Sequence, residues 1–199
     1  MRTRLLHLAT IPLLCTSLAL AGVSVADDLD EREALAMAVT DELFATLSSA
    51  LQDAVEEGGP ENAIGVCRDI APQLKSELSR ETGWRITRVG TRVRNPLLGS
   101  ADAWEQQVLQ QFQESLDDGA ALQDLRHSER VDEPDGQTFR FMRAIGTQEA
   151  CLACHGTRET RHADTFKVLG ELYPHDRAVD YELGDLRGAF SVTMPEHGE

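Results

Sequence analysis

Five consecutive residues constrain this chain more than any other feature of its sequence: Cys151-Leu152-Ala153-Cys154-His155. Two thiols separated by two residues on a turn can reach the two vinyl groups on one edge of a porphyrin and form thioethers with them. The next residue, His155, then lies beneath the iron, where a neutral imidazole binds through one ring nitrogen while the other nitrogen needs a hydrogen-bond acceptor. The motif therefore predicts one covalently attached haem c, with His155 as an iron ligand.

Two other kinds of site also use a Cys-x-x-Cys pair: a redox dithiol and one half of a zinc site. A zinc site would need a fourth ligand besides Cys151, Cys154 and His155. A thioredoxin-like site would need a surrounding βαβ pattern, which the sequence lacks. Because a histidine directly follows the second cysteine, the motif favours haem over both alternatives.

The N-terminus indicates export. Arg2 and Arg4 precede an apolar stretch, and Ser24-Val25-Ala26 supplies the small residues of a cleavage site. We expect residues 1–26 to be a signal peptide and residues 27–199 to form a single domain in the periplasm. We expect no membrane insertion of the mature chain.

The charge balance narrows the possible partners. The chain carries 34 acidic and 19 basic side chains, a net charge of −15. Nucleic acids and anionic lipids both bind cationic surfaces, so this balance excludes a default nucleic-acid binder and argues against docking on an anionic membrane. An acidic surface can steer a protein toward a basic redox or signalling partner.

Apolar periodicity predicts helices first and strands later. A stripe from Leu35 to Val55 predicts a long helix that ends at Gly58-Gly59-Pro60, and a second helical pattern runs from Glu61 to Thr82. Further along, the sequence predicts a strand pair around Gly90, a helix capped by Asp102, turns from Val131 to Gly136, a strand over Thr138 to Ile145, a helix over Ala163 to Leu172 and a strand over Phe190 to Met194. We therefore expect an α+β fold with helices packed on one sheet.

A single haem leaves the sixth position of the iron to be assigned. The candidates are Cys67, Met37, Met142, Met194, His127, His162, His175 and His197. Met194-Pro195 resembles the arrangement in class I cytochromes c, but Met194 also continues the apolar face of a strand. Cys67 lies on an apolar helix face, so we expect it to point into the core. A buried, unpaired thiol fits an inert cysteine, an intermolecular disulfide or a thiolate bound to iron.

Basic and aromatic side chains could border the haem. The segment from Arg80 to Arg94 holds five arginines and one acid, and a guanidinium fork suits the carboxylates of haem propionates. Arg88, Arg92 and Arg94 are our candidates for this contact, although each also fits a solvated strand face. Tyr173 is a further candidate for the border of the haem pocket, or equally a core residue at a helix end.

Several segments, taken in order, resemble a known family. They are Cys67-Arg68-Asp69-Ile70-Ala71-Pro72, Arg92-Val93-Arg94-Asn95-Pro96, Trp104-Glu105, Cys151 to His155 and Tyr173-Pro174-His175-Asp176. This set looks like the single-haem, PAS-like c-type haem domain family, which is similar to a cyanobacterial haem protein with Cys and His axial ligands. The resemblance implies a PAS-like antiparallel sheet with N-terminal and flanking helices, His155 as the proximal ligand and Cys67 as the opposite ligand.

Three functions compete. A sensor of redox state, CO or NO would use displacement of Cys67 from the iron, and a soluble electron-transfer cytochrome would use the small size, the single haem and the acidic surface. A haem enzyme would need an open iron site with a distal acid-base residue, and two protein ligands argue against it. We expect redox or gas sensing, with electron transfer as the alternative.

Overall fold

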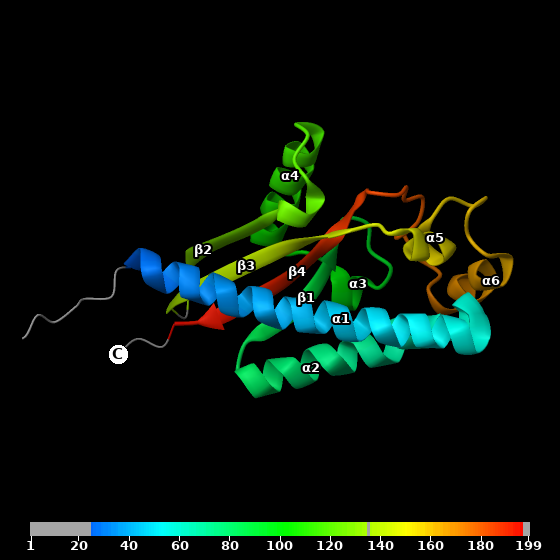
Figure 1. Cartoon of the computed structure of the whole chain (residues 1–199), viewed down its shortest axis with the longest axis horizontal. Coiled ribbons are helices and arrows are strands. Elements are labelled where there is room, and N and C mark those ends of the chain that lie inside the picture. Colours follow the sequence, from blue (N-terminus) through cyan, green and yellow to red (C-terminus); the bar gives the residue numbers. More distant parts are fainter. Residues whose placement is uncertain (1–24, 135, 197–199) are drawn as a thin grey trace, which may run out of the picture.

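The computed structural model describes residues 25–134 and 136–196, which form an α+β fold (Figure 1). The helices are α1 (Val25–Gly65), α2 (Ala71–Thr82), α3 (Pro96–Gly99), α4 (Ala103–Asp117), α5 (Glu149–His155) and α6 (Ala163–Leu172), with a π-helical turn η1 (Val66–Ile70) between α1 and α2 and a short turn η2 (Leu122–Asp124). The strands are β1 (Arg85–Gly90), β2 (Arg126–Glu133), β3 (Gly136–Gly146) and β4 (Leu186–Pro195). Except for Val25 and Ala26, which begin α1, the expected signal peptide lies outside the described residues.

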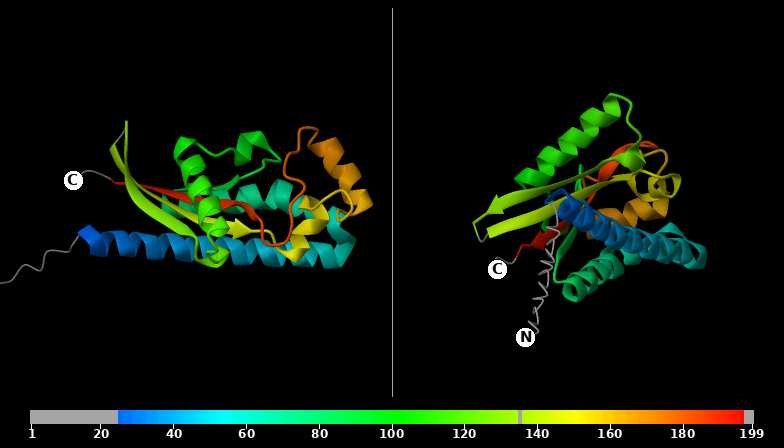
Figure 2. Two further views of the ribbon diagram at one scale, coloured as in Figure 1. Left: turned by 90° about the horizontal axis from the view of Figure 1, so that it is seen from above. Right: turned by 60° about the vertical axis from the view of Figure 1, so that its left-hand side comes forward.

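The strands form one sheet in the order β1-β4-β3-β2, and every neighbouring pair is antiparallel. The expected α+β class with an antiparallel sheet is therefore confirmed. The PAS-like assignment stays a prediction. Helices cover both faces of this sheet, as Figure 2 shows, so side chains on both sides of the central strands are buried.

Alternating residues of the two central strands enter two different cores. On one face Phe139, Phe141, Phe190 and Val192 pack against α1. On the opposite face Met142, Ala144 and Ala189 pack against the buried side of α4, which Val108, Leu109 and Phe112 provide. The period of two in the strand sequences thus places apolar side chains on both faces of a fully covered sheet.

Helices α1 and α2 form a long two-helix wall beside the sheet (Figure 1). The predicted break at Gly58-Gly59-Pro60 is confirmed, because Gly58 and Gly59 leave helical geometry and Gly59 has a φ of 78°. The stretch Asp28–Thr82 is long and apolar enough to cross a membrane, a test that core helices also pass, and its Ala36 and Leu43 belong to the core. The wall is therefore built from two helical segments joined at Gly58-Gly59-Pro60, and Cys67 lies in the second segment.

One strand prediction is wrong, and one strand was not predicted. The segment around Gly90 contains a single strand, β1, which pairs with β4 instead of folding back on itself. Strand β2 was not expected, because its residues Arg126–Glu133 are mostly charged and lie at the edge of the sheet. Val131 to Glu133 consequently belongs to a strand, and the expected turn is confined to the hairpin between β2 and β3.

Candidate haem site

The motif Cys151 to His155 lies on α5, a helix of seven residues at one end of the sheet (Figure 1). Residues three apart on a helix share a face, so Cys151 and Cys154 are neighbours on the same side. Both side chains are partly buried and free of disulfide bonds. Burial raises the pKa of the Cys154 thiol to about 11, and the nearby Arg94 only partly opposes this effect. The two thiols are thus placed next to each other, as thioether attachment to one porphyrin requires.

The imidazole of His155 has one ring nitrogen in close contact with a backbone carbonyl. Its Nδ1 lies 2.7 Å from the carbonyl oxygen of Ala178, which can only accept, and 3.1 Å from Nη2 of Arg94, which can only donate. The shorter contact assigns the proton to Nδ1, which donates it to Ala178. Burial, assisted by the charges of Arg187 and Arg94, holds the pKa of His155 well below its usual value. The ring is therefore neutral with Nε2 deprotonated, which is the form that binds a metal.

Arg94 connects α5 to the loop that contains Ala178. Its Nη2 donates to the carbonyl of Cys154 at 2.8 Å, and its Nε donates to Asp176 at 2.8 Å. Asp176 in turn accepts a hydrogen bond from the N–H of Ala178. Because Ala178 holds His155, this chain of contacts fixes the orientation of the imidazole.

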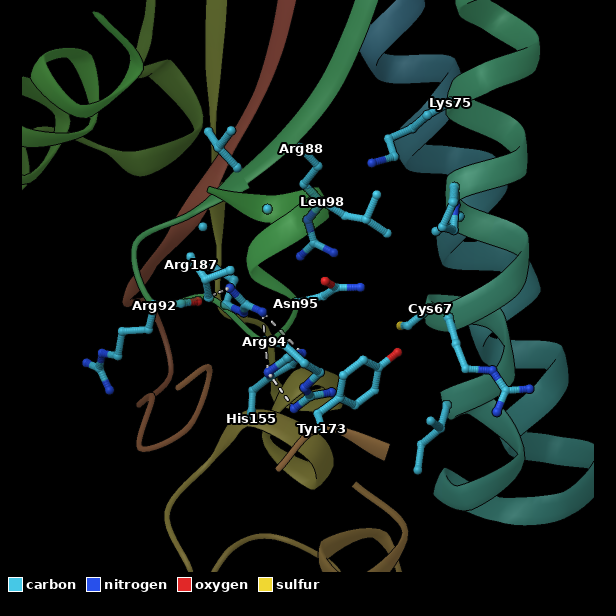
Figure 3. Close-up of a pocket in the computed structure, with 18 of the residues that line it drawn as sticks. Cys67, Lys75, Arg88, Arg92, Arg94, Asn95, Leu98, His155, Tyr173 and Arg187 are labelled. Carbon is cyan, nitrogen blue, oxygen red and sulfur yellow. Dashed lines mark hydrogen bonds between the residues drawn. The ribbon is translucent and has the colours of Figure 1, made fainter. Parts of the chain in front are cut away.

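A cavity of about 260 Å³ lies between the helical wall and the sheet end, and Cys67 and His155 both line it. The prediction that Cys67 points into the core is wrong: the side chain is exposed and faces this cavity. Figure 3 shows its sulfur on the helical wall, directed toward the side from which His155 and Tyr173 enter. Cys67 and Ala71 of the apolar helix face border the cavity, whereas Leu74 and Leu78 of the same face pack against the core. Tyr173 borders the cavity as expected.

Of the sixth-ligand candidates within the described chain, Cys67 is the one that lines the cavity. Met142 and Met194 are buried in the two cores, and Met37 packs against one of them. His127 and His175 lie elsewhere, and His197 is outside the described residues. His162 bonds to Glu61 instead.

The three arginines named from the sequence differ in their contacts. All line the cavity. Arg94 is engaged with Asp176 and Cys154, and Arg92 donates to the carbonyls of Val179 and Asp180 at 2.6 and 2.7 Å. Arg88 has no hydrogen bond or ion pair to any described residue. Arg92 and Arg94 therefore stabilise the loop around His155, while the guanidinium of Arg88 is free to bind an anion.

Sequence reasoning missed three residues of the site. Arg187 is 7% exposed, lines the cavity and places its Nη2 3.4 Å from both ring nitrogens of His155. Tyr181 is fully buried beneath it, with the guanidinium of Arg187 4.9 Å from its ring centroid. Lys75 lines the cavity from α2. The one signal for Arg187 was a charged residue three positions before the strand predicted over Phe190 to Met194.

Covalent haem proteins need neighbouring thiols, an imidazole with a deprotonated nitrogen and a cavity beside it, and the end of this sheet supplies all three. The fold and the site together are those of a haem-binding protein. A family model described as Tll0287-like matches residues 23–195, and the chain belongs to that family.

Among solved structures, the chain is similar to the cyanobacterial heme-protein Tll0287, known from a crystal structure. The two are 28% identical, the match covers 85% of this chain and 98% of that chain, and the TM-score is 0.64. No curated protein matches the chain significantly. These findings support haem as a ligand of this protein.

Proposed function

We propose that this protein is a periplasmic, single-haem c-type protein that senses redox state or a small gas molecule. Its haem is attached through Cys151 and Cys154, and its iron is bound by His155 on one side and Cys67 on the other. The PAS-like assignment is part of this proposal and is supported by an antiparallel sheet with flanking helices.

One observation carries the proposal: Cys67 and a neutral His155 enter the same cavity from opposite walls. A haem bound there would supply a one-electron redox centre. The protein holds His155 through Ala178, so the imidazole is oriented before it meets iron. Cys67, by contrast, is exposed in a π-helical turn and its side chain forms no hydrogen bond with a described residue, so it can leave the iron more readily than His155.

Mass spectrometry of the exported protein tests the attachment. The mature polypeptide is expected to begin at Asp27 and to carry the mass of one haem, and acidified organic solvent should not extract that haem. Substitution of both Cys151 and Cys154 by Ala should leave the haem extractable. Extractable haem in the unsubstituted protein would contradict covalent attachment.

Electron paramagnetic resonance of the ferric protein tests the ligand set. A thiolate opposite an imidazole gives a low-spin ferric signal, which Cys67→Ser should abolish because a serine hydroxyl is a much weaker ligand. Met194→Leu is the matched control, since Met194 is 2% exposed and buried in the core. An unchanged signal in Cys67→Ser would eliminate thiolate ligation.

Electron transfer is the second candidate function, and the net charge of −15 favours it. Such a surface steers a basic redox partner toward the protein. The two functions differ in what reduction does to Cys67. A sensor releases the sulfur and then binds CO, whereas a carrier keeps both ligands and does not react with CO.

A further inference from the structure

Arg187 faces the cavity because strand β4 is irregular at this residue. Pairing with β3 skips Arg187: one β3 residue pairs with Gly188 and the next pairs with Leu186. Leu186 and Ala189 therefore both face α4, and Arg187 is turned to the other side. Gly188 makes this possible with a φ of 148°, and a Cβ there would lie 2.0 Å from the carbonyl oxygen of Val89. The backbone irregularity thus directs the guanidinium of Arg187 into the cavity.

That cation is not neutralised by the protein. Arg187 is 7% exposed, and no carboxylate of a described residue lies within ion-pair distance of it. Its Nε has no hydrogen-bond partner in the described chain, and its Nη1 has one long contact of 3.4 Å to the carbonyl of Arg92. A buried, unpaired guanidinium is costly unless an anion binds it.

Two more cations face the same space without partners. Arg88 on β1 and Lys75 on α2 line the cavity, and neither forms an ion pair with a described residue. Burial, together with the charge of Arg88, lowers the pKa of Lys75. The residues that line this cavity include six basic side chains and no acidic one, in a chain with 34 acids. The cavity is thus cationic within an acidic protein.

The position of these cations matches the chemistry of a porphyrin. The vinyl groups and the two propionates of a haem lie on opposite edges of the ring. Thioethers to α5 would place the vinyl edge at the end of the cavity that holds His155. Figure 3 shows Arg88 and Lys75 at the other end, with Arg187 between them and His155. The free cations are therefore within reach of the propionate edge.

We propose that Arg88, Lys75 and Arg187 form the carboxylate subsite that binds the haem propionates inside the cavity, and that Arg92 and Arg94 do not contact them. This inference rests on the proposed haem function and deepens it. It replaces two of the three arginines that the sequence suggested. Its distinctive member is Arg187, which a bulge and a glycine direct toward the ligand.

Redox-induced infrared difference spectroscopy of the haem-loaded protein tests the subsite. The probe is haem labelled with ¹³C in the propionate carboxylates, so that their bands are separated from those of protein carboxylates and free anions. Arg88→Gln and Lys75→Met are expected to shift the labelled bands and to lower the midpoint potential, because a lost cation favours ferric iron. Arg187→Lys keeps the buried positive charge but loses the planar guanidinium that can donate two parallel hydrogen bonds to a carboxylate. It should therefore shift the labelled bands as well.

Arg80→Gln is the matched control, because it removes the same charge from an exposed position of α2 outside the cavity. It should leave the labelled bands and the potential unchanged. If Arg88→Gln, Lys75→Met and Arg187→Lys behave like this control while haem remains attached, the carboxylate subsite is wrong and haem binding stands. If only unlabelled bands shift, the cations bind something other than the propionates, and the subsite is again wrong. If the wild-type protein carries no haem, the proposed function itself is overturned.

Discussion

Arg94 and Asp176 are the residues on which the orientation of His155 depends, although neither touches its free nitrogen. Their side chains are only 12% and 10% exposed, and their ion pair spans 2.8 Å. Removal of one member of a buried pair leaves the other charge buried without compensation. This ion pair therefore contributes more to the stability of the folded protein than a surface ion pair would.

Arg94→Gln is expected to destabilise the haem-loaded protein by about 3 kcal/mol, mainly because the carboxylate of Asp176 is left buried and unpaired. Urea unfolding followed by circular dichroism measures the change. Asp176→Asn should cost a similar amount, and the double variant should cost clearly less than the sum of the two. Additive costs would show that the two side chains act independently.

At the scale of single elements, the π-turn η1 decides where Cys67 points. Its N–H to carbonyl bond runs from Ala71 to Val66, one residue further than in an α-helix. Pro72 explains the turn, because it has no N–H and its ring would clash with the carbonyl of Arg68 in a regular helix. An extra residue in one turn rotates the residues before it relative to α2.

Pro72→Ala should allow a regular α-helix and turn Cys67 away from the cavity, since one residue corresponds to about 100° of helix rotation. The low-spin ferric signal is expected to weaken while the haem stays attached. Gln73→Ala, an exposed neighbour on α2, is the control and should keep the signal. A wild-type signal in Pro72→Ala would show that the π-turn does not position the sulfur.

The cap of α4 offers a pH-dependent test of a second element. The carboxylate of Asp102 accepts two hydrogen bonds, one from the backbone N–H of Glu105 and one from the guanidinium of Arg140. Partial burial raises the pKa of Asp102, but these hydrogen bonds outweigh it and hold the pKa below its ordinary value. A lowered folded-state pKa means that the charged form stabilises the fold above the unfolded pKa, and that this contribution is lost as pH falls through the folded pKa.

Asp102→Ala should cost about 1 kcal/mol of stability at neutral pH through loss of the cap. Asp102→Asn keeps a capping oxygen but loses the charge, so its deficit should be present above about pH 4 and shrink at lower pH. Thermal unfolding across this pH range measures both variants. If the stability deficit of Asp102→Asn does not change with pH, the charge on Asp102 does not contribute to folding stability.

For the whole molecule, the sequence predicted what depends on local pattern. The haem motif, the helix break at Gly58-Gly59-Pro60, the cap at Asp102 and the apolar strand around Phe190 need only neighbouring residues. Two residues that it missed or placed wrongly depend on irregularities of the backbone. A bulge turns Arg187 toward the cavity, and a π-turn exposes Cys67, and neither leaves an apolar period to detect.

In the proposed function, the helical wall and the sheet end each supply one ligand of the iron. Cys67 is the ligand candidate on the wall, whereas His155, Ala178 and Arg94 belong to the sheet side. Release of Cys67 would remove the proposed link through the iron between the two sides, while the core contacts of α1 and α2 with the sheet would remain. The accessibility of this thiol is therefore a readout of iron ligation.

Alkylation with iodoacetamide would label that thiol selectively in the mature haem-loaded protein, because the proposed thioethers would block Cys151 and Cys154. The side chain of Cys67 is exposed, so it reacts unless iron holds it. We expect protection in the ferric state and labelling after reduction, because Fe(II) binds a thiolate less strongly than Fe(III). Mass spectrometry counts the label, and Cys67→Ser, which has no free thiol, is the blank. Protection in both states would favour electron transfer over sensing, and labelling of the ferric protein would show that Cys67 does not bind the iron.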